Sequence, residues 1–331
     1  MTRYVVKRLL MMIPVLLCVA IVIFTIMYFA PGDPVALVLG DHYTEEQYIQ
    51  TAAELGLDKP FFVQLGIFLR DTFLRLDFGT SYVLKTDVAT ELMARLPRTV
   101  IIATVCCLLQ IVIAIPLGIA AATHQNGAVD KLCVGLAMFG ISVPGFWIGM
   151  LMILLFSLKL GWLPSSGVQH WYSYIMPCVA NSLMGVGGMT RMTRSQMLEV
   201  IRSDYVVTAR AKGVPERSIL YSHALPNALI PIVTYIGTHF GRSLGGTVVI
   251  ETVFGIPGIG YYIMSAVNNR DYPIVRGGVT LLALLFCLVV LAVDILYAYI
   301  DPRIKAQYEN SGRKKKPRTP PKAKKEAAAN G

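Results

Sequence analysis

The chain has 331 residues, of which 55% are hydrophobic and 15% are charged, and its mean hydropathy is +0.58. Soluble domains carry roughly 25% charged residues, so this composition excludes an ordinary soluble globular protein and indicates a protein that lies in a lipid bilayer. The formal net charge is +10, and much of it lies after residue 300.

Six apolar segments are long enough to cross a membrane, which requires about 20 residues per helix. They are 9–30, 99–122, 133–158, 174–192, 226–251 and 278–300. We therefore predict an all-α polytopic membrane protein with six transmembrane helices, in which residues 1–30 hold the N-terminus and helix 1 and residues 99–305 hold helices 2–6. An even number of spans places both termini on one side of the membrane.

The first apolar segment could be a secretory signal, because Arg3, Lys7 and Arg8 precede it. Its apolar run of about 22 residues exceeds the roughly 7–15 residues of a signal core, and no A-x-A-like cleavage site follows it. We interpret the segment as a retained membrane anchor.

The distribution of Lys and Arg over the short connections predicts the orientation of the spans. Basic residues precede span one and surround span four, from Arg191 to Arg217, whereas the third connection, 159–173, has only Lys159. We therefore expect both termini and the polar segment after span four to face the cytoplasm.

The longest aqueous segment, 31–98, lies on the outer side and carries ten Asp or Glu and six Lys or Arg, a net charge of −4. Thr44 and Gln47 form a capping-box pattern at the start of a helix that Gly56 ends. Apolar residues at near-helical spacing follow between Phe61 and Leu76. We expect two or three short helices, whose apolar stripe could pack onto the spans or contact a soluble partner.

The last segment, 306–331, is a basic, proline-containing tail of low complexity, which we expect to be disordered. After residue 300 the chain carries ten Lys or Arg and three Asp or Glu. Because the tail follows a span directly, we expect it to bind anionic lipid on the cytoplasmic face rather than nucleic acid.

Few ionisable residues lie within the spans, where a charge is costly to bury. Arg242 and His239 lie in the outer half of span five, and Asn181 is a polar residue of span four. An arginine at this depth faces protein or water, so these three residues are candidates for lining a translocation path. Glu251 and Asp294 are expected to pair with neighbouring residues near the membrane surface.

Signatures of catalysis are missing from the sequence. It contains no H-E-x-x-H, G-x-S-x-G or G-x-x-x-x-G-K-[ST] motif. Its five histidines are scattered, and its six cysteines have neither disulfide nor zinc spacing. We therefore expect no catalytic residue, no metal site and no cofactor held by this chain.

A short polar segment separates spans four and five. Ser203 or Asp204 can cap a helix that begins at Tyr205, and Gly213 can close that helix in a left-handed conformation. Pro215 suits the first turn of a second helix. A pair of short helices joined to spans on both sides would act as a lever for a cytoplasmic partner.

This segment also carries a sequence pattern. Four residues match the spacing Glu-Ala-Ala-x3-Gly-x9-Ile-x-Leu-Pro, namely Ala209, Gly213, Leu225 and Pro226, whereas Val207, Thr208 and His223 depart from it. The segment thus resembles the cytoplasmic EAA loop of prokaryotic ATP-binding-cassette importer permeases. The stretches "TARAKG", "ISVPGFWIG", "FGIPGIG" and "YAYIDPRIK" are similar to the dipeptide, oligopeptide and nickel branch of that family, and the resemblance runs from residue 3 to about residue 305.

The resemblance implies a first-type permease subunit with an enlarged outer loop, in a prokaryotic cytoplasmic (inner) membrane. It implies four partners: a second homologous permease subunit, two cytoplasmic ATPase subunits that use ATP and Mg²⁺, and an extracytoplasmic substrate-binding protein. The ATPases would dock on the loop at about 199–225. The residues implied for coupling are Ala209, Arg210, Lys212, Gly213, Glu216, Leu225 and Pro226.

The resemblance implies a di- or oligopeptide as substrate, with nickel complexes or another small solute as alternatives in the same branch. A self-sufficient secondary transporter is the alternative from another class, since such proteins also place ionisable residues within spans. The sequence shows no convincing internal repeat of the kind common in that class. A membrane enzyme would require clustered His, Asp or Ser.

Overall fold

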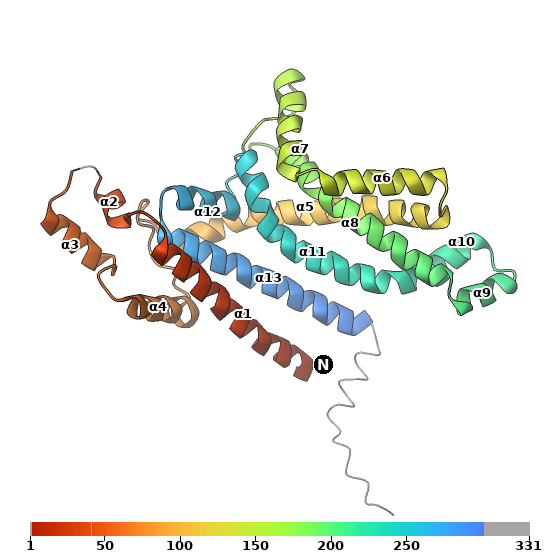
Figure 1. Cartoon of the computed structure of the whole chain (residues 1–331), viewed down its shortest axis with the longest axis horizontal. Helices are drawn as coiled ribbons and strands as arrows, with labels where there is room; N and C mark the ends of the chain where they lie inside the picture. The colour runs from red at the N-terminus through yellow and green to blue at the C-terminus, as the bar shows by residue number, and fades with distance from the viewer. Residues whose placement is uncertain (1, 41, 301–331) are drawn as a thin grey trace, which may run out of the picture.

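The computed structural model describes residues 2–40 and 42–300, and the predicted basic tail at 306–331 lies outside them. Long helices run along the molecule: α1 (Thr2–Phe29), α5 (Val88–Thr123), α6 (Ala128–Ser142), α8 (Ile175–Ile201), α11 (Leu225–Val253) and α13 (Tyr272–Ile300) (Figure 1). Short helices gather at both ends, with α2 (Pro34–Leu39), α3 (Glu45–Glu54) and α4 (Phe61–Arg70) at one end and α9 (Asp204–Ala211) and α10 (Glu216–Ser218) at the other. The described residues form no strand beyond one isolated bridge, which confirms the all-α class.

Four helices are long and apolar enough to cross a membrane: Val5–Phe29, Val88–Thr123, Glu216–Val253 and Tyr272–Leu296. A fifth candidate is a bent pair, Ala128–Ser142 and Gly145–Lys159, whose axes differ by 93°. The predicted third span, 133–158, is therefore broken rather than straight. Pro144 accounts for the break, because the residue before a proline avoids the helical conformation, and Val143 is extended with φ −97° and ψ 124°.

The second half of that broken segment stands apart from the other long helices. It consists of α7 (Gly145–Met152) and a π-helical continuation, η2 (Ile153–Lys159), and it projects from the bundle (Figure 1). The predicted fourth span, 174–192, is helical within α8, but α8 is less apolar than the candidate spans because Asn181, Arg191 and several glycines interrupt it.

The described residues between 31 and 87 form three short helices, where two or three were predicted, and a π-helical turn, η1 (Asp71–Arg75). Thr44 and Gln47 make the expected capping box, in which the Gln47 backbone N–H donates to the Thr44 hydroxyl and the Thr44 N–H donates to Gln47 Oε1. Asp87 caps α5, so the second long helix begins at Val88, before the predicted span at residue 99. Residues 88–98 thus belong to the second long helix.

The helices of the bundle approach one another closely at glycines. α5 and α8 meet at Gly118, where an added Cβ would lie within 3 Å of Thr193 and of the Thr190 carbonyl. Because small residues permit this approach and the interior leaves no room for a side chain, the two helices form one packed unit.

Both carboxylates expected to pair with neighbours do so. Asp294 of α13 forms an ion pair with Arg8 of α1, with 2.7 Å between Oδ2 and Nη1. Glu251 accepts hydrogen bonds from the Thr99 hydroxyl (2.7 Å) and the Tyr261 N–H (3.0 Å), and its side chain is fully buried within the protein. It thereby joins α11 and α5 to the N-terminus of α12 (Ile259–Asn268).

Candidate coupling site and translocation path

The polar segment after α8 folds as a compact knob. Helix α9 begins at Asp204, one residue earlier than predicted. Ser203 stands at the N-cap position, but its hydroxyl donates to the Val200 carbonyl (2.6 Å), so neither Ser203 nor Asp204 supplies the expected side-chain cap. The start of α9 is set instead by backbone bonds that Val206 and Val207 donate to the Ser203 carbonyl.

The end of α9 is a Schellman turn closed by Gly213. The Gly213 N–H donates to the Arg210 carbonyl (3.0 Å) and the Val214 N–H donates to the Ala209 carbonyl (3.3 Å). Gly213 has φ +77°, and no atom lies within 4 Å of where its Cβ would stand. The need for glycine therefore comes from the backbone conformation and not from lack of space.

An ion pair crosses this turn. Arg210 Nη2 lies 2.6 Å from Glu216 Oε1, and Arg210 Nε lies 3.1 Å from Oε2, so the contact is bidentate. The Glu216 carboxylate, through this hydrogen bond, raises the pKa of Arg210. Both side chains are exposed, so the pair fixes the shape of the turn more than it stabilises the fold.

The second helix of the knob does not end before span five. Residues Glu216–Val253 form one continuous helix, which consists of α10, a π-helical stretch, η4 (Ile219–Ala224), and α11. Pro226 lies in the first turn of α11, at the predicted start of the span 226–251, but the helix itself already begins at Glu216. A proline lacks the N–H of a regular turn, and the wider π-helical turn before it lets the helix continue.

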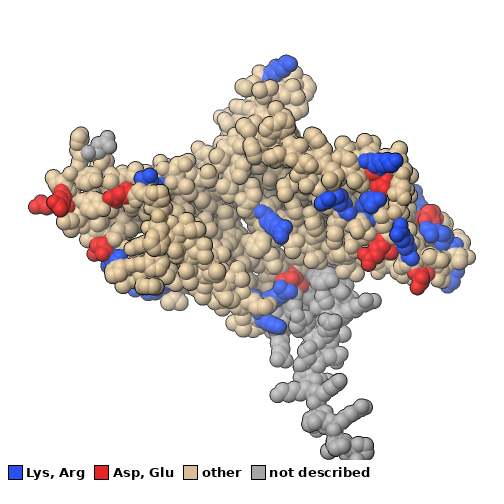
Figure 2. All heavy atoms as spheres, in the orientation of Figure 1, with Lys and Arg blue, Asp and Glu red and all other residues tan. Residues whose placement is uncertain are grey.

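One face of the knob is buried against the bundle, and the opposite face is exposed. Val206, Ile219 and Ala224 are fully buried. The exposed face carries Tyr205, Val207, Arg210, Lys212, Gly213, Glu216, Tyr221 and Pro226, while Ala209 and Leu225 are half-buried. Figure 2 shows that Lys, Arg, Asp and Glu gather at the α9–α10 end of the molecule, whereas few lie along its middle.

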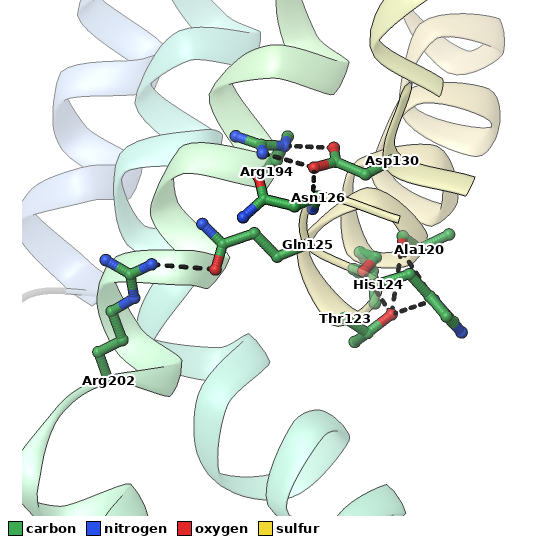
Figure 3. Close-up of polar contacts among 9 residues, drawn as sticks. Ala120, Thr123, His124, Gln125, Asn126, Asp130, Arg194 and Arg202 are labelled. Carbon is green, nitrogen blue, oxygen red and sulfur yellow. Dashed lines mark hydrogen bonds and ion pairs between the residues drawn. The ribbon is translucent and has the colours of Figure 1, made fainter. Parts of the chain in front are cut away.

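A polar network that the sequence did not single out fixes the neighbouring turn between α5 and α6 (Figure 3). Arg194 of α8 forms a bidentate pair with the buried Asp130, at 2.6 and 2.7 Å. Asp130 also accepts the Asn126 N–H (2.8 Å), and Arg202 donates to Gln125 Oε1 (2.9 Å). Asp130 in the first turn of a helix after Gly127 was the available signal, but its arginine partner is 64 residues away.

The candidate path residues are divided between two helices. Arg242 is exposed on α11, together with Gly245, Gly246 and Val249 at helical spacing, and nothing lies within 4 Å of a Cβ at either glycine. His239 is half-buried and stacks on Tyr235, with ring centroids 5.6 Å apart. α11 therefore presents one open, narrow face.

Asn181 of α8 has a different environment from Arg242 and His239. Its side-chain amide donates to Cys106 Sγ of α5 at 3.5 Å, and no hydrogen bond joins it to the other two candidates among residues 2–40 and 42–300. The structure therefore brings Arg242 and His239 together on one helix and leaves Asn181 in the contact between α5 and α8.

Comparison with known families decides the identity of the chain. Residues 114–306 match the binding-protein-dependent transport system inner membrane component, and residues 1–103 match the N-terminal part of the same membrane component. The chain belongs to this family. It is a permease subunit of an ATP-binding-cassette importer, a multi-pass inner membrane protein and a transport subunit rather than an enzyme, which confirms the resemblance.

Full-length relatives are similar over almost their whole length. The glutathione transport system permease protein GsiC of Salmonella typhimurium is 41% identical over 305 residues, which cover 92% of this chain and 99% of the relative. A putative peptide transport system permease protein of Brucella abortus is 41% identical over 313 residues, with the same coverage. Among solved structures, an inward-facing MetNI methionine ABC transporter gives a TM-score of 0.53 at 19% identity, covering 63% of this chain and 96% of that chain, which shows a shared fold.

Proposed function

We propose that this chain forms half of a peptide translocation path, with six spans and both termini in the cytoplasm. In addition to the five candidates by hydropathy, α8 is the fourth span along the chain; it is more polar than the others but packs between α5, α6 and α11. Support for peptide as substrate comes from the relatives, which are permeases of glutathione and peptide transport systems.

The observation that carries the proposal is the continuous helix Glu216–Val253. It joins the exposed knob at one end of the bundle to the open face of α11 that bears Arg242. A protein that moves the knob therefore moves the path helix directly, without a flexible link between them.

In this mechanism a second homologous permease subunit supplies the other half of the path, and an extracytoplasmic binding protein delivers the peptide. Two cytoplasmic ATPase subunits dock on the two knobs and use ATP and Mg²⁺. Closure of the ATPases on ATP draws the knobs together and opens the path outward, and hydrolysis returns it inward. Residues 209–226 couple the subunits and do not bind substrate.

The open face of α11 is the proposed wall of the path. The exposed Gly245 and Gly246 lie beside the exposed cation of Arg242, which suits both the approach of another backbone and a hydrated route. We expect Arg242→Leu to alter transport while the complex still assembles. Unchanged uptake in that variant would remove Arg242 from the path.

Reconstitution tests the whole proposal. The chain is co-expressed with its partner genes, purified in mild detergent and placed in proteoliposomes with the binding protein. We expect ATPase subunits to co-purify and peptide uptake to require ATP. A chain that purifies alone and transports a solute along an ion gradient would identify a secondary transporter instead.

A further inference from the structure

Two cavities that share part of their walls lie beside the helices α2, α3 and α4, away from the proposed path on α11. One of about 400 Å³ is bounded by α3, α4 and the turn before α5, and one of about 670 Å³ is bounded by α1, α2 and α3. Leu57, Gln64 and Arg276 form part of the wall of both. Each volume lies in the range of small-molecule sites, about 300–1,000 Å³.

Arg276 is held in place without a carboxylate partner. Its Nε donates to the Tyr272 carbonyl (3.3 Å) and its Nη2 lies 3.5 Å from the Tyr82 hydroxyl. The guanidinium carbon stands 5.1 Å from the centre of the Phe24 ring and 5.5 Å from that of Phe68. No Asp or Glu of the described chain lies within ion-pair distance of Arg276. Its guanidinium therefore faces the cavities with N–H donors that have no partner.

The carboxylates around these cavities differ in their hydrogen-bond and ion-pair partners. Asp33 accepts the Val35 and Ala36 N–H groups, and its hydrogen bond with Tyr48 raises the pKa of that phenol. Asp71 pairs with two arginines. Asp58 lines the larger cavity, is exposed, and makes no hydrogen bond or ion pair within the part of the chain that the structure describes.

We infer that these cavities form an extracytoplasmic binding site for a small zwitterionic peptide, whose carboxylate binds Arg276 and whose ammonium group lies by Asp58. The inference rests on the proposed peptide substrate. A planar guanidinium is suited to bidentate recognition of a carboxylate, and the aromatic lining suits apolar side chains. The outer segment carries a net charge of −4, which disfavours a simple anion and tolerates a zwitterion.

The roof of the site can move to admit a ligand. α3 and α4 contain no buried residue, and α4 meets the bundle through Phe61 and Phe68 on Phe24, with 5.5 Å between the ring centroids in both pairs. Gln64 donates to the carbonyls of Leu57 and Lys59 and so holds the linker between the two helices as one wall. The site thus combines the linker held by Gln64 with the Arg276 side chain, and α3 and α4, which are weakly attached to the bundle, cover both.

Binding of labelled Ala-Ala to the purified transporter complex, without its binding protein, tests this site. We expect saturable binding to the unmodified complex, and binding of the C-terminal amide of Ala-Ala to be weaker by about tenfold, because the amide lacks the charged acceptor. Arg276→Gln should reduce Ala-Ala binding by a similar factor. Lys159→Gln removes an exposed cation outside both cavities, and this matched control should bind normally.

Because Arg276 also packs on aromatic rings, its replacement can disturb the fold as well as the binding. A second variant separates these two effects. Asp58→Asn removes a charge from an exposed side chain without contacts, and we expect it to weaken binding of Ala-Ala but not that of N-acetyl-Ala-Ala. Absence of saturable Ala-Ala binding, or equal binding by the Arg276→Gln and Lys159→Gln complexes, would overturn the site. ATP-driven peptide uptake, measured on the same complexes, distinguishes failure of this site from failure of the proposed function. Normal uptake without saturable Ala-Ala binding refutes the site but not the importer function.

Discussion

The two ends of the molecule use the same turn for opposite purposes. Gly213 closes α9 and Gly56 closes α3, both with positive φ, and in each case the next N–H bonds back to the helix to complete a Schellman turn. After Gly213 the chain enters the continuous helix Glu216–Val253. On the side that faces the bundle, Val206, Ile219 and Ala224 are fully buried. After Gly56 it enters α4, which buries no residue.

The difference shows that attachment, and not the local turn, decides what a polar segment can do. A knob fused to a span transmits force, whereas helices held by a few ring contacts can shift and admit a ligand. The comparison predicts that equal local damage at the two ends will have unequal consequences.

The largest effect is expected where the coupling end is locked to the bundle. Arg194→Met leaves the carboxylate of the buried Asp130 with only a backbone N–H as partner, which should destabilise the protein by about 3 kcal/mol. Thermal unfolding in detergent measures it. Arg202→Met removes an exposed contact to Gln125 and should change the unfolding temperature little. Equal losses in both variants would mean that the pair does not lock the α5–α6 turn.

The matched turns give the sharpest contrast. A β-branched residue at positive φ costs about 1–2 kcal/mol, and neither glycine has a neighbour within 4 Å of its Cβ position, so Gly213→Val and Gly56→Val carry the same strain. We expect Gly213→Val to weaken ATPase binding or to uncouple hydrolysis from uptake, and Gly56→Val to leave ATPase binding unchanged. Co-purification and hydrolysis rates decide this. Normal, substrate-stimulated hydrolysis with normal uptake in Gly213→Val would make the knob a mere connector.

The smallest effect concerns the ion pair across the coupling turn. Because Arg210 and Glu216 are both exposed, Glu216→Gln should leave the free energy of unfolding almost unchanged. High salt should reduce the difference further. Chemical unfolding at two salt concentrations measures it, and a loss comparable to that of Arg194→Met would show that the pair is structurally essential.

Sequence reasoning succeeded where the signal is local. The capping box at Thr44 and the left-handed conformation of Gly213 follow from neighbouring residues alone. It failed where distant residues decide the outcome. The Asp130–Arg194 pair and the network at Arg276 depend on which helices become neighbours, and no pattern along the chain specifies that.

Two further differences come from the backbone. The bend at Pro144 was hidden within an apolar run long enough to pass for one straight span. Pro226 stands in the first turn of α11, and the π-helical stretch η4 before it joins α10 and α11 into one helix, which no pattern in the sequence predicted. Apolar content predicts that a segment is buried in lipid, and it does not predict whether the helix is straight.

The central claim is that the knob and the path helix move as one body. Spin labels at Thr208 on α9 and Thr252 near the outer end of α11, with the exposed Cys18 replaced by Ser, report the distance between them by pulsed electron paramagnetic resonance. The account predicts the same distance in the nucleotide-free and ATP-bound complexes, while uptake shows that the transporter cycles. A change of about one helical turn, roughly 5 Å, on ATP binding would show that η4 bends as a hinge and would contradict the rigid lever.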